Sequence, residues 1–339
     1  MDQALGVAQK ICDRMNDFRF VHDDRRFRIG TSIGLVHIDK RWPNPAAILQ
    51  AADSSCYAAK EAGRNRVHAW FDTEGALGVH QSKMQWTSRI ERALDEDGFA
   101  LFAQRIQSLK EARRGVHAEV LLRLKNEDGT FAQPSAFMPA AERFRLSSRV
   151  DRWVLRHALG WLKALPAIGD IHVLSINLSG QSLGDSAFLA WAKESLTQAG
   201  HDVCTRLCLE ITETAIVSNL TDAAHFIEVV RKAGVKVAVD GFGAGAYSFG
   251  YLKTLPLDYL KIDGQFIRDL IEDPLHEAAV RCFTDVAKAI DVRTVAESVE
   301  RRAVVDRLCA IGVDYSQGDL FHRPEPIDLL LQGVRAQAI

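Results

Sequence analysis

The chain has 339 residues, of which 47% are hydrophobic and 25% are charged, proportions typical of folded globular domains. Its formal net charge of −2 argues against bulk binding to a nucleic acid polymer or an anionic membrane surface. No apolar run reaches about 18 residues and no N-terminal signal pattern occurs, so we expect no membrane segment in this chain. The six cysteines lack paired short spacings, which indicates reduced thiols in a cytoplasmic compartment.

The N-terminal segment contains too little regular structure to bury a core alone. Apolar side chains at helical spacing predict a helix over 4–17, and a second helix is predicted over 45–62, with Pro45 in its first turn. Strands are predicted over 27–36, where glycines interrupt the pattern, and over 65–71. These elements are fewer than an independent domain requires.

Several short motifs of this segment resemble the C-terminal third of GGDEF (diguanylate cyclase) domains. They are Thr31-Ser32-Ile33-Gly34, Ala52-Asp53, Tyr57, Ala59-Lys60 and Gly63-Arg64-Asn65. In that family the metal-binding aspartate and the Gly-Gly-Asp-Glu-Phe turn stand upstream of these motifs, and neither occurs in this chain. Residues 1–71 are therefore interpreted as a GGDEF fragment without cyclase activity, and Met1 as a boundary inside a longer domain.

A connection over 72–90 is predicted to lead into a second domain over 91–335. Ile90, Ala93 and Leu94 have the spacing of an amphipathic helix at the domain entrance. Such a helix could carry a signal between the modules or act as a plain linker packed on the second domain.

From Phe99 onward strands alternate with helices, which is the pattern of a (β/α)8 barrel. The predicted strands span 99–106, 118–124, 171–178, 207–212, 235–240, 257–262, 293–296 and 315–317, and the predicted helices span 150–165, 188–199, 223–233, 274–290 and 303–311. Only about a dozen residues separate the first two strands, which indicates an antiparallel opening pair. The predicted fold class is α/β: a modified (β/α)8, TIM-like barrel preceded by an incomplete α/β fragment.

Polar side chains stand near the ends of these strands, each on a different strand. They are Glu119, Asn177, Glu210, Asp240, Lys261, Glu297 and Gln317. Any one of them could simply cap a helix or form an ion pair, but the repetition indicates one site at the mouth of the barrel. Four converging acids would repel one another without a counter-charge, and carboxylate and amide oxygens suit Mg²⁺ or Mn²⁺ better than zinc.

The motifs around these residues resemble the EAL family of cyclic-di-GMP phosphodiesterases over residues 91–335. They are Glu119-Val120-Leu121 with Leu122-Arg123, Asn177-Leu178-Ser179, Glu210-Ile211-Thr212-Glu213, Lys261-Ile262-Asp263, Ala296-Glu297-Ser298-Val299-Glu300 and Gln317-Gly318. The resemblance implies a bacterial, cytoplasmic signalling protein that hydrolyses cyclic-di-GMP to linear pGpG with two divalent cations. It also implies a barrel that can pair as a homodimer.

The resemblance further implies a role for each residue. The implied ligands of the first metal are Glu119, Asn177, Glu210 and Asp240. The implied catalytic residues are Glu119, Lys261 and Glu297, with Lys261 holding the attacking water. The implied substrate-binding residues are Gln104, Arg123 and Gln317, and Glu213 is the implied brace of the loop after Asp240.

The sequence departs from the family pattern at several positions, and the main departure is the motif that begins at Asp240. The family's Asp-Asp-Phe-Gly-Thr-Gly reads Asp240-Gly241-Phe242-Gly243-Ala244-Gly245 here, and its second aspartate is a ligand of the second metal. Gly241 has no side chain to offer, so we expect it to reduce turnover more than binding. Two interpretations stay open: an attenuated phosphodiesterase, favoured by the otherwise complete set, and a catalytically inactive receptor for cyclic-di-GMP.

Overall fold

The computed structural model describes residues 2–22, 25–28, 30–39, 42, 44–61, 65–69, 86–110, 115–245 and 249–332. The chain divides into two compact units, Met1–Gln85 and Trp86–Ile339. Residues 72–85 of the predicted connection, and Gly63-Arg64 of the GGDEF-like motifs, lie outside the described residues.

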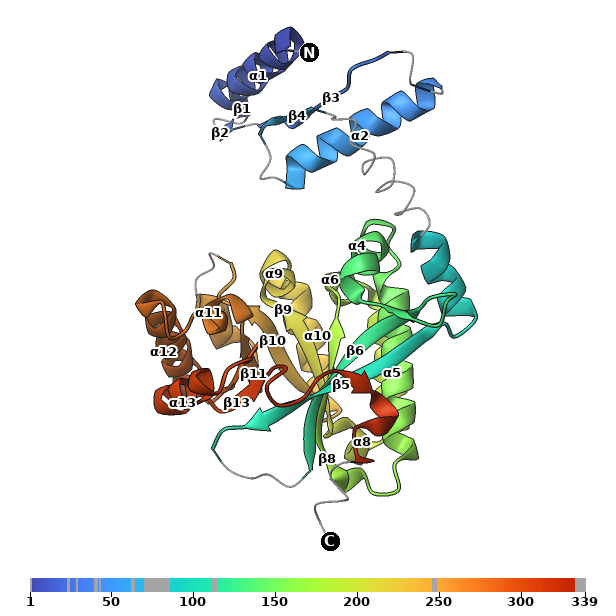
Figure 1. Ribbon diagram of the computed structural model, residues 1–339, viewed down its shortest axis with the longest axis vertical. Coiled ribbons are helices and arrows are strands. Elements are labelled where there is room, and N and C mark those ends of the chain that lie inside the picture. Colours follow the sequence, from blue (N-terminus) through green and yellow to red (C-terminus); the bar gives the residue numbers. More distant parts are fainter. Residues whose placement is uncertain are drawn as a thin grey trace. The chain divides into compact units, whose positions relative to one another are not determined.

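The first unit contains both predicted helices and two small sheets (Figure 1). Its elements are α1 (Asp2–Asp17), β1 (Arg19–His22), β2 (Arg25–Arg28), β3 (Ile33–Leu35), α2 (Pro45–Glu61) and β4 (Val67–Ala69). The strand β1 was not predicted. It pairs antiparallel with β2, whereas β3 pairs parallel with β4. A Cβ on Gly34 would lie 2.2 Å from the carbonyl oxygen of Ala52, so glycine permits the close packing of β3 on α2.

The second unit is a closed barrel, which confirms the predicted fold class (Figure 1). Its eight strands are β5 (Phe99–Ser108), β6 (Val116–Lys125), β8 (Ile171–Leu178), β9 (Leu207–Thr212), β10 (Lys236–Phe242), β11 (Tyr259–Ile262), β12 (Arg293–Ala296) and β13 (Tyr315–Gln317). Two short strands outside the closed ring pair with barrel strands: β7 (Phe131–Ala132) with β6, and β14 (Glu325–Pro326) with β5.

The first barrel strand runs against both of its neighbours. The strand β5 pairs antiparallel with β6 and with β13, whereas the pairs from β6 through β8 to β13 are parallel. The predicted antiparallel opening pair is therefore confirmed. As a result, the beginning of β5 and the end of β6 lie at the same end of the barrel.

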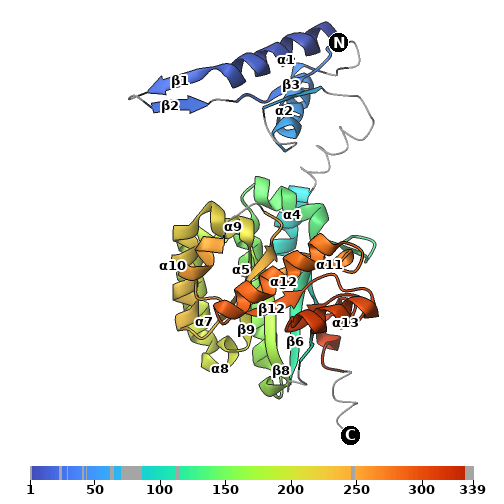
Figure 2. The same ribbon diagram turned by 90° about the vertical axis from the view of Figure 1, so that its left-hand side faces the viewer.

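Helices cover the outside of the barrel in both views (Figures 1 and 2). A helix over 86–95 precedes β5. The longer helices that follow are α4 (Pro134–Arg143), α5 (Ser147–Ala164), α7 (Ser186–Ala199), α10 (Leu220–Lys232), α12 (Pro274–Ala289) and α13 (Arg302–Ile311). The shorter ones are α6 (Gly180–Leu183), α8 (His201–Cys204), α9 (Glu213–Ser218) and α11 (Gly264–Arg268), with 3-10 turns at Ile168–Asp170, Phe249–Thr254 and Ile327–Leu329. Helix α4 was not predicted. Among the described residues, no helix combines the length and apolar character needed to span a bilayer.

Alternation along the strands produces two separate cores. Outward side chains such as Leu101, Val120 and Leu209 pack against the helices in one large cluster. Inward side chains form a second, smaller layer inside the barrel: Ile106, Val173, Cys208, Ala238, Tyr259, Val295 and Tyr315. This inner layer closes the barrel beneath the positions of the predicted site.

Candidate active site

The predicted site residues occupy the next inward positions above the inner apolar layer. Because side chains on one face of a strand recur every second residue, Glu210 follows Cys208, Asp240 follows Ala238 and Lys261 follows Tyr259. The same spacing relates Glu297 to Val295 and Gln317 to Tyr315, and, on the antiparallel β5, Gln104 to Ile106. Because of this spacing, polar side chains from all eight barrel strands, including Glu119 of β6 and Asn177 of β8, lie at one level of the barrel.

Lys261 lies at the centre of this level and is 1% exposed. Its ammonium nitrogen is 2.6 Å from Oε2 of Glu210 and 2.9 Å from Oε2 of Glu119. It is also 2.9 Å from Oε1 of Glu297 and 3.6 Å from Oδ1 of Asp240. The four predicted acids therefore converge on one point, and the lysine supplies the counter-charge there.

Glu119 is held by amide groups as well as by the lysine. Asn177 Nδ2 donates to Glu119 Oε1 at 2.6 Å, and Gln317 Nε2 donates to Glu119 Oε2 at 2.8 Å. Gln317 Nε2 also donates to Gln104 Oε1 at 3.0 Å, and Gln104 Nε2 donates to the carbonyl oxygen of His322 at 2.9 Å. Gln104 and Gln317, assigned from the sequence to substrate binding, thus form a buried chain that positions Glu119.

The acids differ in their affinity for protons. Burial would raise the pKa of Glu119, but the Lys261 charge and the amide hydrogen bonds lower it below its usual value. Burial and the charge of Glu119 raise the pKa of Glu210 well above its usual value, and burial raises that of Glu297 to about 7. Burial would lower the pKa of Lys261, but the surrounding carboxylates raise it well above its usual value. The cluster carries more negative charge than one lysine neutralises.

The chemistry of these donors fits a hard divalent cation. Carboxylates and an asparagine amide are oxygen ligands of the kind that Mg²⁺ and Mn²⁺ take. Oε1 of Gln317 is buried and accepts no hydrogen bond from the described residues, so the cluster contains an acceptor that a bound water could satisfy. Among those residues, no group of three or more His, Cys, Asp or Glu is arranged around a position for a metal, and the point of convergence holds the lysine.

Gly241 lies beside this cluster in a left-handed conformation, with φ +64°. Its strand, β10, continues two residues beyond Asp240, the predicted end, to Phe242, with an irregular register between Val239 and Phe242. A Cβ on Gly241 would have its nearest neighbour at 3.8 Å, Oδ2 of Asp263. A side chain at this position would therefore have room and would point toward another carboxylate.

The loop after β10 is connected to Glu213, the residue that the resemblance assigns as its brace. Glu213 is 3% exposed, and its Oε2 accepts a hydrogen bond from the amide of Gly243 at 3.0 Å. Its Oε1 accepts one from the hydroxyl of Tyr251 at 2.9 Å. The sequence analysis missed Tyr251, because only the fold shows that this tyrosine of the 3-10 turn returns to α9.

Asp151 is a buried acid that the sequence analysis also missed. Its Oδ2 accepts hydrogen bonds from the amide and hydroxyl of Ser179 at 2.9 and 2.6 Å, and from the hydroxyl of Ser182 at 2.6 Å. Ser179 stands two residues after Asn177, so Asp151 fixes the chain where it leaves β8. Asp151 lies on α5, and no sequence motif connects it with that turn.

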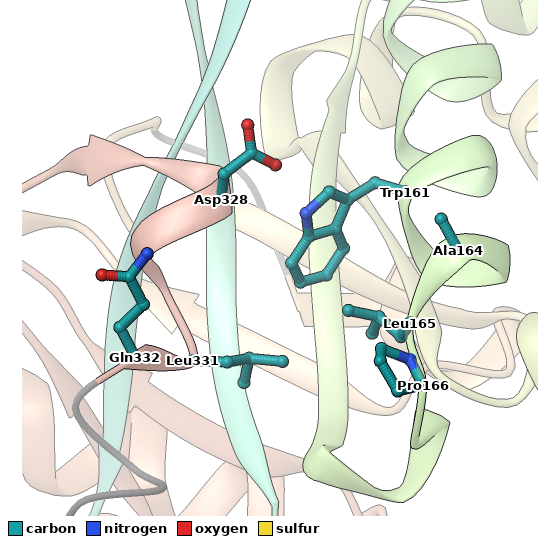
Figure 3. Close-up of a pocket in the computed structure, with 7 residues that line it drawn as sticks. All are labelled: Trp161, Ala164, Leu165, Pro166, Asp328, Leu331 and Gln332. Atoms are coloured by element: carbon teal, nitrogen blue, oxygen red, sulfur yellow. The ribbon is translucent and has the colours of Figure 1, made fainter.

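Two surface cavities lie away from the carboxylate cluster. One, of about 390 Å³, lies between the end of α5 and the C-terminal segment, with Trp161, Leu165, Asp328 and Leu331 in its lining (Figure 3). The other, of about 860 Å³, is lined by arginines of α4 and α5 and by α6. Neither contains a residue of the predicted site.

Comparison with known proteins identifies the second unit. The sequence model of the EAL domain matches residues 87–324, most of the chain. The chain belongs to the EAL domain family. The matched range contains the whole carboxylate cluster together with Gly241.

Two relatives match the chain, and the alignment with one of them also covers the first unit. The chain is 35% identical over 328 residues to the cyclic di-GMP phosphodiesterase PdeB of Shewanella oneidensis, covering 96% of this chain and 38% of that protein. It is 32% identical over 247 residues to the cyclic di-GMP phosphodiesterase PdeF of Escherichia coli, covering 73% of this chain and 32% of that protein. The chain thus spans about a third of the length of these relatives.

Solved structures of EAL domains match the barrel. The FimX EAL domain of Pseudomonas aeruginosa bound to c-di-GMP has 26% sequence identity and a TM-score of 0.65, covering 71% of this chain and 96% of that one. The PaMucR phosphodiesterase in complex with c-di-GMP has 29% sequence identity and a TM-score of 0.65, covering 73% of this chain and 100% of that one. The similarity therefore extends from sequence motifs to the arrangement of the barrel.

Proposed function

We propose that this protein binds cyclic-di-GMP at the mouth of the barrel and hydrolyses one of its phosphodiester bonds to give linear pGpG. The observation that carries this proposal is the convergence of Glu119, Glu210, Asp240 and Glu297 on Lys261 inside an EAL barrel. The names of the relatives and the bound c-di-GMP of the matched structures support the choice of ligand.

We infer that Mg²⁺ or Mn²⁺ is required, held by Glu119, Asn177, Glu210 and Asp240. When bound, such a cation activates water and neutralises charge on the phosphate. Metal binding requires deprotonated ligands, and Glu210 has a raised pKa in the cluster without metal. The cation must therefore displace a proton from the cluster, so its affinity should fall at acidic pH.

The reaction itself is a simple exchange at phosphorus. The oxygen of water forms a bond to phosphorus, the bond from phosphorus to one ribose 3′ oxygen breaks, and a proton from water ends on that oxygen. The ammonium group of Lys261 holds a positive charge next to the position of the attacking oxygen. Burial raises the pKa of Glu297 to about 7, so Glu297 can accept a proton near neutral pH. Gln104 and Gln317 keep Glu119 in the orientation that the cluster needs.

Gly241 is the reason for a second candidate function. Without the carboxylate that Gly241 lacks, the second cation binds weakly or not at all. The rate of hydrolysis then falls by orders of magnitude, since each tenfold corresponds to about 1.4 kcal/mol of transition-state stabilisation. The affinity for cyclic-di-GMP falls less, because Arg123 and the barrel mouth still bind it. A receptor that binds cyclic-di-GMP without cleaving it would follow. The complete cluster around Lys261 favours the enzyme, because a binding module needs no buried lysine among carboxylates.

The deciding experiment compares the unchanged protein with Gly241→Asp. Each is incubated with cyclic-di-GMP and Mn²⁺, and pGpG is measured by chromatography. We expect slow product formation by the unchanged protein and at least tenfold faster formation by the variant. Product from the variant alone would establish the receptor, and no product from either, with binding retained, would refute Gly241 as the limiting defect.

A matched inactive variant completes this test. Glu119→Gln keeps the size of the side chain but removes its charge, so we expect turnover to fall by two or more orders of magnitude. Undiminished hydrolysis by this variant would remove Glu119 from the site.

For the rest of the chain we infer a GGDEF fragment without cyclase activity over 1–71, a bacterial cytoplasmic setting, and pairing of barrels as a homodimer. The parallel pair of β3 and β4, joined through α2, supports the first inference. Assay for cyclic-di-GMP synthesis from GTP tests it, and sedimentation equilibrium tests the dimer.

A further inference from the structure

Two phenylalanines and an arginine form an unusual surface at the rim of the barrel. The rings of Phe102 on β5 and Phe131 on β7 meet edge to face, with centroids 5.1 Å apart and planes at 67°. The guanidinium carbon of Arg123 on β6 lies 5.4 Å from the centre of the Phe102 ring. Three neighbouring strands thus contribute one side chain each.

Strand register places these side chains on the same face as the carboxylate cluster. Gln104 pairs with Glu119, Phe102 pairs with Leu121, and Phe131 pairs with Lys125. Because one face recurs every two residues, Phe102 shares the inward face of Gln104, and Arg123 shares that of Glu119. Since β5 begins at the mouth of the barrel, Phe102 lies one inward position, about 7 Å, closer to the rim than Gln104.

These side chains are accessible rather than part of a core. Phe131 is 42% exposed, and both Phe102 and Arg123 are half-buried. Among the described residues, the hydrogen bond of the Arg123 guanidinium goes to the carbonyl oxygen of Leu122 at 2.9 Å. The other N–H groups of this side chain remain available for an anion. An exposed π face beside a partly desolvated cation is the arrangement that stacks a base and holds its phosphate.

We propose that Phe102 and Phe131 form an aromatic wall that stacks one guanine base of the dinucleotide, with Arg123 on the phosphate next to that base. This inference rests on the proposed function and adds two residues to it. The carboxylate cluster positions the bond that breaks, whereas the aromatic wall determines how the substrate lies along β5 and β6. It therefore contributes to affinity and to the preference for a purine.

A purely structural role for the two rings makes a different prediction. Phe131 lies on a two-residue strand whose pairing with β6 consists of Leu124 with Ala132 and Lys125 with Phe131. If the ring contact only holds β7 in place, its loss should change stability and leave binding unaffected. Stacking instead requires the π face, so leucine should impair binding and tryptophan should preserve it.

The test measures binding of cyclic-di-GMP by calorimetry in EDTA, with chromatography to verify that the ligand stays intact. The variants are Phe131→Leu, Phe131→Trp and Phe102→Leu, and the control is Phe144→Leu. Phe144 is a matched control because it is also 42% exposed and has Arg143 6.0 Å above its ring. Loss of one stacked base weakens binding by about 5- to 150-fold.

We expect a loss in this range for Phe131→Leu and Phe102→Leu, with Phe131→Trp and Phe144→Leu within about twofold of the unchanged protein. In the Mn²⁺ assay the leucine variants should raise KM with little change in kcat. Equal affinity of the leucine variants and the unchanged protein overturns the aromatic wall and leaves the proposed function standing. Absence of binding by the unchanged protein in EDTA, together with absence of pGpG in the Mn²⁺ assay, overturns both.

Discussion

The ammonium nitrogen of Lys261 lies 2.6 Å from Oε2 of Glu210, inside a barrel level where both side chains are at most 2% exposed. Burial and the charge of Glu119 raise the pKa of Glu210, and the charge of Lys261 opposes this rise. The lysine thus allows a group of acids that would otherwise repel one another to stay together while no cation is bound. The energetic cost of removing it is the first property to test.

Lys261→Met should destabilise the protein by about 3–5 kcal/mol, because it leaves buried carboxylates without their partner. Mn²⁺ should recover more stability in this variant than in the unchanged protein, since a cation can take over the charge compensation. Urea unfolding with and without Mn²⁺ measures both effects.

The control for this variant is Lys232→Met. Lys232 also lies next to a glutamate, Glu228 at 2.8 Å, but these side chains are 71% and 63% exposed. Such a pair contributes about 0–1 kcal/mol. Equal losses from the two substitutions would mean that Lys261 does not compensate the buried acids.

Much of the carboxylate cluster around Lys261 could be predicted from the sequence, because side chains on one face of a strand recur every second residue. Glu210, Asp240 and Lys261 each stand two residues beyond an apolar inward position on a recognisable strand. The antiparallel start was also predictable, since the first two strands are joined by too few residues for a helix. Local pattern and chain connectivity were sufficient for both.

What the sequence could not show depends on closure of the barrel. Gln104 was assigned to substrate binding, yet its side-chain amide forms hydrogen bonds with Gln317 and with the backbone of His322. Both partners are more than 200 residues away in the sequence. The centring of Lys261 among acids from four strands likewise requires the closed ring. Only long-range register brings these partners together, and no local pattern encodes it.

Tyr251→Phe should loosen the loop that follows β10. The tyrosine hydroxyl donates to Glu213, and burial together with this carboxylate raises the pKa of Tyr251, so it stays a donor across the working pH range. Its loss leaves a buried carboxylate with one partner fewer, at a cost of about 1.5–3 kcal/mol. We expect faster hydrogen exchange at the amide of Gly243 and a lower kcat with a smaller change in KM. An exchange rate identical to that of the unchanged protein would contradict this role.

Asp151 should make stability depend on pH between about 4 and 6. Burial raises its pKa to about 6, against about 3.9 in an unfolded chain. The folded state therefore binds the proton more tightly, so the contribution to stability is present below about pH 4 and is lost as the pH rises through about 6. Two pKa units correspond to about 3 kcal/mol.

Asp151→Asn removes this titration while keeping one oxygen to accept from Ser179 and Ser182. Relative to the unchanged protein, the variant should gain up to about 3 kcal/mol of stability between pH 4 and pH 7. Urea unfolding at these two values measures the gain. Parallel pH profiles for the two proteins would show that Asp151 does not hold its proton in the fold.

Substitutions at Gly241 can distinguish the effect of backbone strain from the effect of metal binding. At φ +64° an alanine costs about 1–2 kcal/mol, whereas asparagine and aspartate tolerate this conformation better. Space is no obstacle, because a Cβ would have its nearest neighbour at 3.8 Å, in the carboxylate of Asp263. We therefore expect Gly241→Ala to be less stable than Gly241→Asn.

Gly241→Asp should differ from Gly241→Asn in its response to metal and not in its backbone. The new carboxylate would face Asp263, and two like charges so close disfavour folding until a cation lies between them. Millimolar Mn²⁺ should therefore raise the melting temperature of Gly241→Asp by several degrees more than that of Gly241→Asn, since a ligand that binds only the folded state stabilises it by mass action. The two substitutions have nearly the same shape, so this difference reports the charge alone. Identical shifts would mean that position 241 does not face a cation, and the cause of any slow turnover would then lie elsewhere in the barrel mouth.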